Sequence, residues 1–185
     1  VEPKDEEEAK AFAQAQLLTA KPVLYVCNVA EDEAAEGNAL SEAVFAKAEA
    51  EGAQAVVVSA AIEAELIAMP EEERGEYLEA LGLSESGLAR VIRAGYPLLG
   101  LQTFFTAGPK ESRAWTFPAG AKEPQAAGEI HTDFEKGFIR AETIAYDDYI
   151  ELNGEAGAKE AGKMRQEGKE YLVQDGDVML FKFNV

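Results

Sequence analysis

"PVLYVCNVAED", residues 22–32, sets the interpretation of the first half of this sequence. Its apolar run, Val23 to Cys27, is typical of a short strand that is covered on both faces, as in a parallel sheet. The run ends in Asn28, and Glu31 follows three residues later. Ligands of open α/β sheets bind beyond the carboxyl ends of the strands, so an amide and a carboxylate placed there suit a ligand with both donors and acceptors. The alternative is that Asn28 only shapes a turn and that Glu31 is solvated.

Helices and a second strand follow this stretch along the chain. Asn38 is placed to cap a helix that Gly52 ends, and Asp5 is placed to cap the first helix. Alternating helices and strands are the pattern of a doubly wound sheet. Two strands are too few for such a sheet, so we expect this half to be the end of a larger domain whose beginning lies outside the sequence. The expected helices are 5–19, 39–51, 61–69, 71–81 and 86–95, and the expected strands are 22–27 and 54–59.

The pattern changes after Gly100, where short strands outnumber helices. Pro124 suits the first turn of a helix, and Gly137 suits its end. The order β-β-α-β-β-β in this half predicts a compact α+β module of the β-grasp type, a small mixed sheet packed on one helix. The expected strands are 101–107, 112–120, 138–146, 170–173 and 178–183, the last two around the turn "QDGD", and 154–169 is expected to be a loop or a short helix.

The composition excludes several classes of protein. A net charge of −18 argues against indiscriminate binding to nucleic acid or to an anionic membrane. The charge is uneven, −13 over residues 1–100 and −5 over 101–185, so only the second half has room for a local basic patch. One Cys and one His exclude an internal disulfide framework and a Cys/His zinc site, and fit a reducing, cytoplasmic location. No apolar stretch suits a membrane span or a signal peptide, and the missing initiator Met suggests a fragment or a processed chain.

Two long stretches carry a resemblance to a known family: "LLTAKPVLYVCNVAEDE", and the sequence from "RVIRAGYPLLGLQTFFTAGPKE" through "EYLVQDGDVMLFKFNV". Both resemble the YchF family of P-loop NTPases, in the Obg-like group. The resemblance implies that residues 1–20 are the tail of a helical insert with a lead-in helix. It implies further that 21–100 are the C-terminal part of the G domain, and that 101–185 are a TGS domain, which is a β-grasp module. Family members bind and hydrolyse nucleotide, prefer ATP to GTP, and associate with ribosomes.

The sequence departs from the family's catalytic motifs. It contains neither G-x-x-x-x-G-K-[ST] nor Asp-x-x-Gly, which cradle the phosphates and organise Mg²⁺. We therefore expect this chain alone to hydrolyse nothing and to hold no catalytic or metal-ligating residue. The resemblance implies that Mg²⁺ accompanies ATP in the complete protein.

The resemblance also assigns a role to the opening stretch. GTPases usually end this strand with Asn-Lys-x-Asp, whose Asp accepts two guanine N–H groups. Here Asn28 keeps its place, Val29 replaces the Lys, and Glu31 replaces the Asp. Since an Asn can pair with N6 and N7 of adenine, residues 28–31 are predicted to recognise the base and to favour adenine. Ser59 and Ala60, after the second strand, correspond to a loop that approaches the base, although Ser59 alone is equally typical of a helix cap.

We expect the second half to carry a surface that docks on ribosomal RNA or on a ribosomal protein. The candidate contacts are Arg113, Arg140, Lys163 and Arg165, which are expected to share one surface; the alternative is a solvated mixed face. A second hypothesis makes the chain a stand-alone RNA-binding or regulatory TGS module without catalysis. Structural roles are expected for Cys27, His131 and Trp115.

Overall fold

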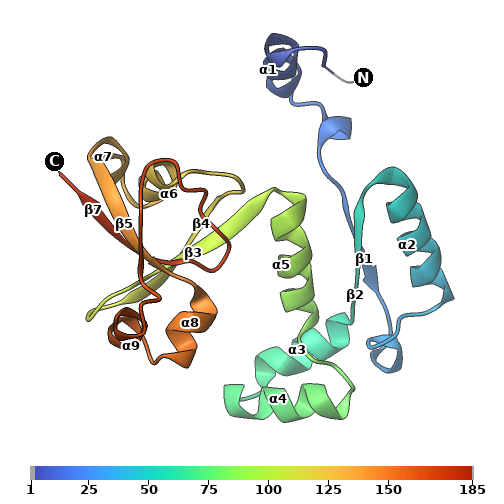
Figure 1. Ribbon diagram of the computed structural model, residues 1–185. Coiled ribbons are helices and arrows are strands. Elements are labelled where there is room, and N and C mark those ends of the chain that lie inside the picture. Colours follow the sequence, from blue (N-terminus) through green and yellow to red (C-terminus); the bar gives the residue numbers. More distant parts are fainter. Residues whose placement is uncertain (1–2, 185) are drawn as a thin grey trace. The chain divides into compact units, whose positions relative to one another are not determined.

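The computed structural model describes residues 3–184 and divides into two compact units, with the boundary between Leu99 and Gly100. Figure 1 shows the course of the chain through both units, each of which is described by itself. In the first unit the structure has the helices α1 (Glu6–Gln14), α2 (Ala39–Glu51), α3 (Ala60–Ala68), α4 (Glu71–Ala80) and α5 (Gly87–Leu98), the 3₁₀ turns η1 (Leu18–Ala20) and η2 (Glu31–Glu33), and the strands β1 (Leu24–Asn28) and β2 (Gln54–Val58).

Two parallel strands form the centre of the first unit. β1 pairs with β2 in a register that sets Leu24 opposite Gln54 and Asn28 opposite Val58. Helix α2 packs on one side of the pair and α5 on the other, which is the arrangement of a doubly wound sheet (Figure 1). The predicted fold class is confirmed, and so is the prediction of two strands. The apolar side chain of Val26 on β1 is exposed.

Capping side chains define the ends of these helices as the sequence predicts. The Asp5 side chain accepts a hydrogen bond from the N–H of Glu8, and the Asn38 side chain accepts from the N–H groups of Leu40 and Ser41. Gly52 ends α2 with a φ of 67°, in the left-handed region that glycine enters without a steric penalty.

Two helix boundaries differ from the prediction. The helix expected over 5–19 ends at Gln14, none of its residues is buried, and Gln16 takes a φ of 47°. A short helix without a buried face has little to stabilise its last turns. The helix expected to end near residue 95 continues through Pro97 to Leu98. So close to its C-terminus, the missing N–H of a proline removes only one helical hydrogen bond.

The second unit is a five-stranded mixed sheet with the strand order β4-β3-β7-β5-β6. β3 and β7 are parallel at its centre, and the other pairs are antiparallel. This confirms the predicted small mixed sheet packed on a helix. Its elements are β3 (Leu101–Ala107), β4 (Ser112–Pro118), α6 (Glu123–Ile130), α7 (Thr132–Lys136), β5 (Phe138–Ile144), α8 (Tyr146–Glu151), α9 (Glu155–Glu160), β6 (Arg165–Glu167) and β7 (Val178–Phe183).

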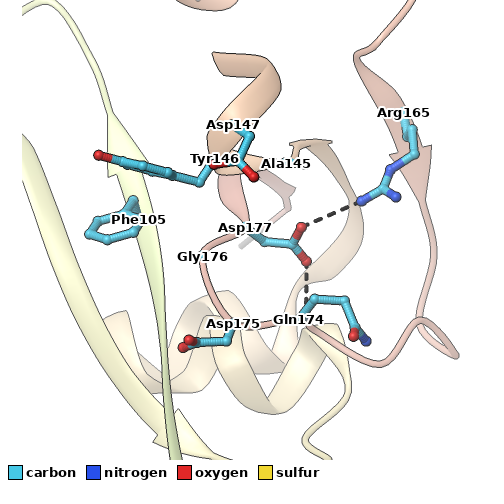
Figure 2. Close-up of a pocket in the computed structure, with 9 residues that line it drawn as sticks. All are labelled: Phe105, Ala145, Tyr146, Asp147, Arg165, Gln174, Asp175, Gly176 and Asp177. Carbon is cyan, nitrogen blue, oxygen red and sulfur yellow. Dashed lines mark hydrogen bonds and ion pairs between the residues drawn. The ribbon is translucent and has the colours of Figure 1, made fainter. Parts of the chain in front are cut away.

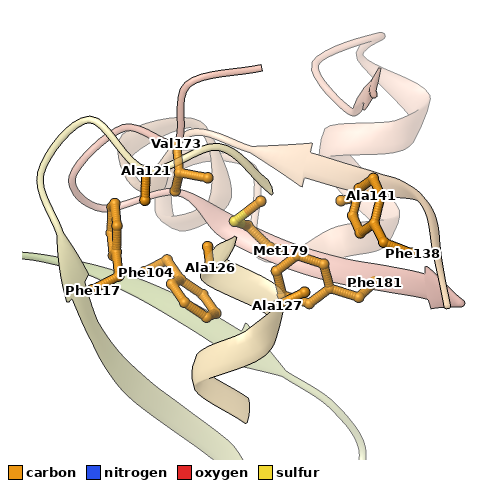
Figure 3. Packing of buried hydrophobic residues seen from close by; sticks show 10 residues of the cluster. All are labelled: Phe104, Phe117, Ala121, Ala126, Ala127, Phe138, Ala141, Val173, Met179 and Phe181. Atoms are coloured by element: carbon orange, nitrogen blue, oxygen red, sulfur yellow. The ribbon is translucent and has the colours of Figure 1, made fainter. Parts of the chain in front are cut away.

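The core of this unit lies between the sheet and α6 (Figure 3). Phe104 is completely buried at its centre, with ring centroids 5.8 Å from Phe117 and 5.6 Å from Phe181. Tilted and edge-on ring pairs at such distances add to the stability that burial of their area provides. Small residues on α6, Ala126 and Ala127, let the helix approach the strands closely.

Two predictions for the second unit are wrong in detail. The helix from Pro124 to Gly137 is interrupted at His131, which is extended (φ −164°, ψ 144°), so that α7 folds back on α6. A Cβ at Gly128 would lie 2.9 Å from the Glu135 carboxylate, which shows how close the two helices are. The segment 170–173 is not a strand of the sheet. It runs beside residues 121–123 instead, and the fifth strand is β6, inside the segment 154–169 expected to be a loop or a short helix.

A completely buried ionisable side chain lies inside the second unit. Glu123, at the start of α6, is 0% exposed. Its Oε1 lies 3.4 Å from the Thr143 hydroxyl, and its Oε2 has no hydrogen-bond partner among the described residues. Burial, together with the nearby charges of Glu167 and Asp177, raises the pKa of Glu123 from 4.5 to about 7. The hydrogen bond from Thr143 acts in the opposite direction and lowers this pKa.

This shift predicts a loss of stability as the pH rises. The folded chain keeps the Glu123 proton up to a pKa of about 7, whereas the unfolded chain releases it near 4.5. The free energy of unfolding therefore decreases between these pH values, by on the order of 1–3 kcal/mol. In urea titrations at pH 5 to 8, Glu123→Gln should lack this decrease. The control is Glu129→Gln, an exposed position on the same helix. If wild type and Glu123→Gln lose stability in parallel, Glu123 does not titrate in this range.

Candidate functional site

The carboxyl ends of β1 and β2 meet at one edge of the strand pair, which brings the predicted loops together. The ladder continues one residue beyond the strands, because the N–H of Val29 donates to the carbonyl oxygen of Val58 at 2.9 Å. Asn28 and Ser59 therefore follow neighbouring strands at the same level. This is the edge at which open α/β sheets bind ligands.

Asn28 ties the two loops directly. Its Oδ1 accepts a hydrogen bond from the backbone N–H of Ala60 at 3.0 Å. Ala60 is the first residue of α3, so the side chain of Asn28, at the end of β1, caps that helix. The Nδ2 group of Asn28 makes no hydrogen bond to the described residues, and it remains a donor for a ligand. Asn28 thus does more than shape a turn.

Ser59 occupies the N-cap position of α3, but its hydroxyl does not cap the helix. The side chain is 3% exposed, and its Oγ has no hydrogen-bond partner in the part of the chain that the structure describes. Asn28, and not Ser59, therefore provides the capping side chain of α3. Ala60, in contrast, is exposed.

Val29 and Glu31 face different surroundings. Val29 is half-buried and packs against the first unit's core cluster, which consists of Ala34, Ile62, Leu66 and Leu83. Glu31 is exposed at the start of η2, and its carboxylate makes no hydrogen bond or ion pair with a described residue. It is available as an acceptor, whereas Val29 serves the packing of the loop.

A cavity of about 260 Å³ lies between β1 and the start of α2. Asn28, Val29, Asn38 and Ser41 contribute to its wall, while Glu31, Ser59 and Ala60 do not. The remaining lining residues are Tyr25, Val26, Cys27, Leu40 and Val44. Cys27, half-buried within the strand, behaves as a small apolar residue there.

Three side chains that support these loops were not predicted from the sequence. Glu33 Oε2 accepts from Asn38 Nδ2 at 2.8 Å, which braces the loop after β1. Glu63 on α3 accepts from the N–H of Gly87 at 2.6 Å, at the N-terminus of α5. Arg90 Nη1 donates to the carbonyl oxygens of Ala34 and Val57, at 3.0 and 3.3 Å. These partners are 5 to 56 residues apart, and no local sequence pattern connects the longer pairs.

The four candidate partner residues do not form one surface. Arg113 shares a side of β4 with Trp115, whose ring packs on the core, and its guanidinium lies 4.1 Å from the centroid of that ring. Arg140 precedes the buried Ala141 on β5, so it points to the opposite side of the sheet. Lys163 pairs with Asp148 at 3.1 Å, and Arg165 pairs with Glu167 and Asp177, both at 3.4 Å.

The residues expected to be structural have local partners. The His131 Nδ1 accepts from the N–H of Asp133 at 3.2 Å, at the break between α6 and α7. The Trp115 Nε1 donates to Thr106 Oγ1 at 2.9 Å. Over residues 3–184, no three His, Cys, Asp or Glu side chains converge so that they could hold a metal ion. No helix of that range is long and apolar enough to cross a membrane.

Comparisons with known proteins extend over nearly the whole chain. Residues 101–184 match the family YchF-GTPase_C, described as a protein of unknown function (DUF933). The chain is 59% identical to the ribosome-binding ATPase YchF of Pasteurella multocida over 98% of its own length and 50% of that protein. It is 44% identical to the Obg-like ATPase 1 of Rattus norvegicus, over 97% of its length and 46% of the relative.

A solved structure agrees with these matches. The Schizosaccharomyces pombe YchF GTPase superposes with a TM-score of 0.81 at 36% identity, over 96% of this chain and 48% of that one. The chain spans about half the length of the curated relatives it matches. Residues 101–184 therefore carry the C-terminal domain of the YchF family, and the chain as a whole is similar to YchF proteins over about half of their length.

Proposed function

We propose that this chain supplies the base-recognition loops and a partner-binding TGS unit of a ribosome-associated nucleoside triphosphatase that prefers ATP to GTP. The observation that carries the proposal is the hydrogen bond between Asn28 Oδ1 and the N–H of Ala60, which holds the ends of both strands together at 3.0 Å. The names of the relatives, ribosome-binding ATPase and Obg-like ATPase, support the same activity and a place in the cytoplasm.

The preference for adenine follows from the groups that the loop leaves free. Asn28 offers its Nδ2 donor and the second lone pair of Oδ1, which match adenine N7 and the N6 amino group. Glu31 carries an unpaired carboxylate at the position where GTPases hold the guanine-binding Asp. Its longer side chain moves the two acceptor oxygens away from the place that guanine N1 and N2 require. Val29 replaces the lysine of the guanine motif, and its side chain packs against the core cluster.

Catalysis requires groups that this chain does not contain. The phosphates need a P-loop, and Mg²⁺ is expected to accompany ATP wherever the complete nucleotide site is assembled. The side chains described over residues 3–184 do not fit a Mg²⁺ site, so no step through the metal is assigned to them.

The isolated 185-residue chain is therefore predicted to be inactive. Phosphate release from ATP or GTP should not exceed that of a heat-treated sample, because neither phosphate contacts nor a nucleophile-positioning group is present. Release that disappears when Asn28 or Glu31 is substituted would show that the chain has a catalytic site of its own.

Base choice can be tested by restoring the guanine motif. In a chimera that adds the P-loop half of a relative, Val29→Lys with Glu31→Asp should shift the affinity ratio toward GTP by about tenfold to a hundredfold, since each well-made polar contact discriminates by roughly 1–3 kcal/mol. Isothermal titration with non-hydrolysable ATP and GTP analogues measures the ratio.

Asn28→Asp provides the matched control for this experiment. It keeps an acceptor for the N–H of Ala60, and so the cap of α3, but it removes the amide donor. Affinity for both nucleotides should fall, while the urea midpoint stays near that of the unchanged chimera. If the chimera with Val29→Lys and Glu31→Asp keeps an unaltered ATP preference, and both variants are folded, the assignment of the loop is refuted.

The second unit is proposed to dock on ribosomal RNA or protein. Arg140 and Lys163 are exposed. Arg165 forms an ion pair with Asp177, which is only 3% exposed, so substituting Arg165 would disturb the fold. A stand-alone TGS module without catalysis remains the second candidate function, favoured by the compactness of residues 100–185 as a separate unit.

Co-sedimentation with ribosomes tests this docking on each face of the sheet. Arg140→Gln with Lys163→Gln should weaken pelleting, and, if the partner is RNA, should reduce the log–log salt slope by roughly 0.7–0.9 per lost phosphate contact. Arg113→Gln, on the opposite side of the sheet, is the matched control. Pelleting that is unchanged by both variants and by removal of residues 100–185 would place the contact elsewhere in the protein.

A further inference from the structure

The second unit contains a cavity that the proposed function does not use. It measures about 470 Å³, within the range of ligand pockets in proteins. Its wall comes from β3, the junction of β5 and α8, β6, and the turn before β7 (Figure 2). The lining residues are Phe105, Ala145, Tyr146, Asp147, Arg165, Gln174, Asp175, Gly176 and Asp177.

Two aromatic rings form one side of this cavity. The centroids of Phe105 and Tyr146 lie 5.6 Å apart with their planes tilted by 39°, and Figure 2 shows both rings opposite Asp177 and Arg165. Tyr146 is 49% exposed, although it is a large apolar side chain. The face of an aromatic ring attracts cations, most strongly where the ring is partly shielded from water.

The turn that carries the carboxylates is fixed to the sheet. The Asp175 Oδ1 accepts from the N–H of Thr103 at 2.7 Å, the N–H of Gly176 donates to the carbonyl oxygen of Thr103 at 2.7 Å, and the N–H of Phe105 donates to the carbonyl oxygen of Asp177 at 2.8 Å. These bonds fix Asp175 and Asp177 in position relative to β3. The site is therefore preorganised.

The charges of the side chains that line the cavity do not cancel one another. Asp177 is bonded to Arg165, to the Tyr171 hydroxyl at 2.9 Å, and to the N–H of Gln174 at 2.9 Å. Asp147 is exposed and has no hydrogen bond or ion pair to any described residue. Three aspartates against one arginine leave the wall with a net negative charge.

The one arginine of the wall is not free to bind an anion. The Arg165 guanidinium lies 5.4 Å from the centroid of the Tyr171 ring and pairs with Glu167 as well as Asp177. A phosphate group would have to displace these carboxylates and would face Asp147 and Asp175 at the same time. The cavity therefore disfavours nucleotides and RNA backbone.

We propose that this cavity binds the guanidinium or ammonium group of a basic protein segment, with the cation between the Tyr146 and Phe105 rings and the carboxylates of Asp147 and Asp175. A cation next to an aromatic face and an unpaired carboxylate gains from both. The cavity exceeds the volume of one side chain, so the flanking backbone of the segment also enters it, where Gln174 offers an amide. The inference goes beyond the proposed function and does not depend on the nucleotide loops.

The test uses the 185-residue chain and short peptides that differ in one group. An acetylated, amidated Gly-Arg-Gly peptide should shift the backbone amide NMR signals of Tyr146, Asp147 and Gly176 saturably, with a Kd of about 1 mM or below. The isosteric citrulline peptide, which has no charge, should not. Asp147→Asn and Tyr146→Leu should each weaken arginine binding by about threefold to tenfold, while the control Glu129→Gln leaves it unchanged.

Three outcomes would overturn the proposal. Equal shifts with arginine and citrulline peptides would show that charge is not recognised. Equal affinities of Asp147→Asn and Glu129→Gln, both folded by circular dichroism, would exclude the carboxylate. Tighter binding of a short RNA oligonucleotide or of free spermidine at the same amides would show that the ligand is not a protein segment.

Discussion

The parallel pairing of β1 and β2 is the constraint on which the candidate site depends. It sets Asn28 opposite Val58, so both strands end at the same level. The Asn28 side chain then reaches the N–H of Ala60 and caps α3. A shift of register by one residue would turn Asn28 to the other face of the pair and would break this bond. Helix capping and the proposed base recognition thus rest on the same amide side chain.

The second unit depends on another parallel pair, β3 and β7, at the centre of its sheet. Their contact places Phe104 in the middle of the core and ties the turn before β7 to β3. The same turn supplies two of the three carboxylates of the cavity, those of Asp175 and Asp177, so the central strand pairing positions much of its negative wall. Glu123 is completely buried in this unit, and its raised pKa reflects the free energy cost of burying a charge.

Predictions based on local chemistry were accurate. Caps such as Asp5 and Asn38, and Gly52 as a helix end, were found as expected, because a cap involves residues about two to four positions apart. Errors occurred where contacts between distant segments of the chain decide the structure. Residues 170–173 have the composition of a strand, but their partners lie at 121–123 outside the sheet. Arg113 and Arg140 lie on different strands, β4 and β5, and point to opposite sides of the sheet.

The sequence by itself determined the α/β and β-grasp classes, the family resemblance and the polar residues after β1, since these follow from hydrophobic periodicity and from matching segments. The tertiary structure alone decided that Asn28, not Ser59, caps α3, that Arg90 bonds the carbonyl groups of Ala34 and Val57, and that aspartates and aromatic rings meet in one cavity. Each of these contacts joins segments that lie far apart in the chain, and such distances close only when the strands pair and the core packs.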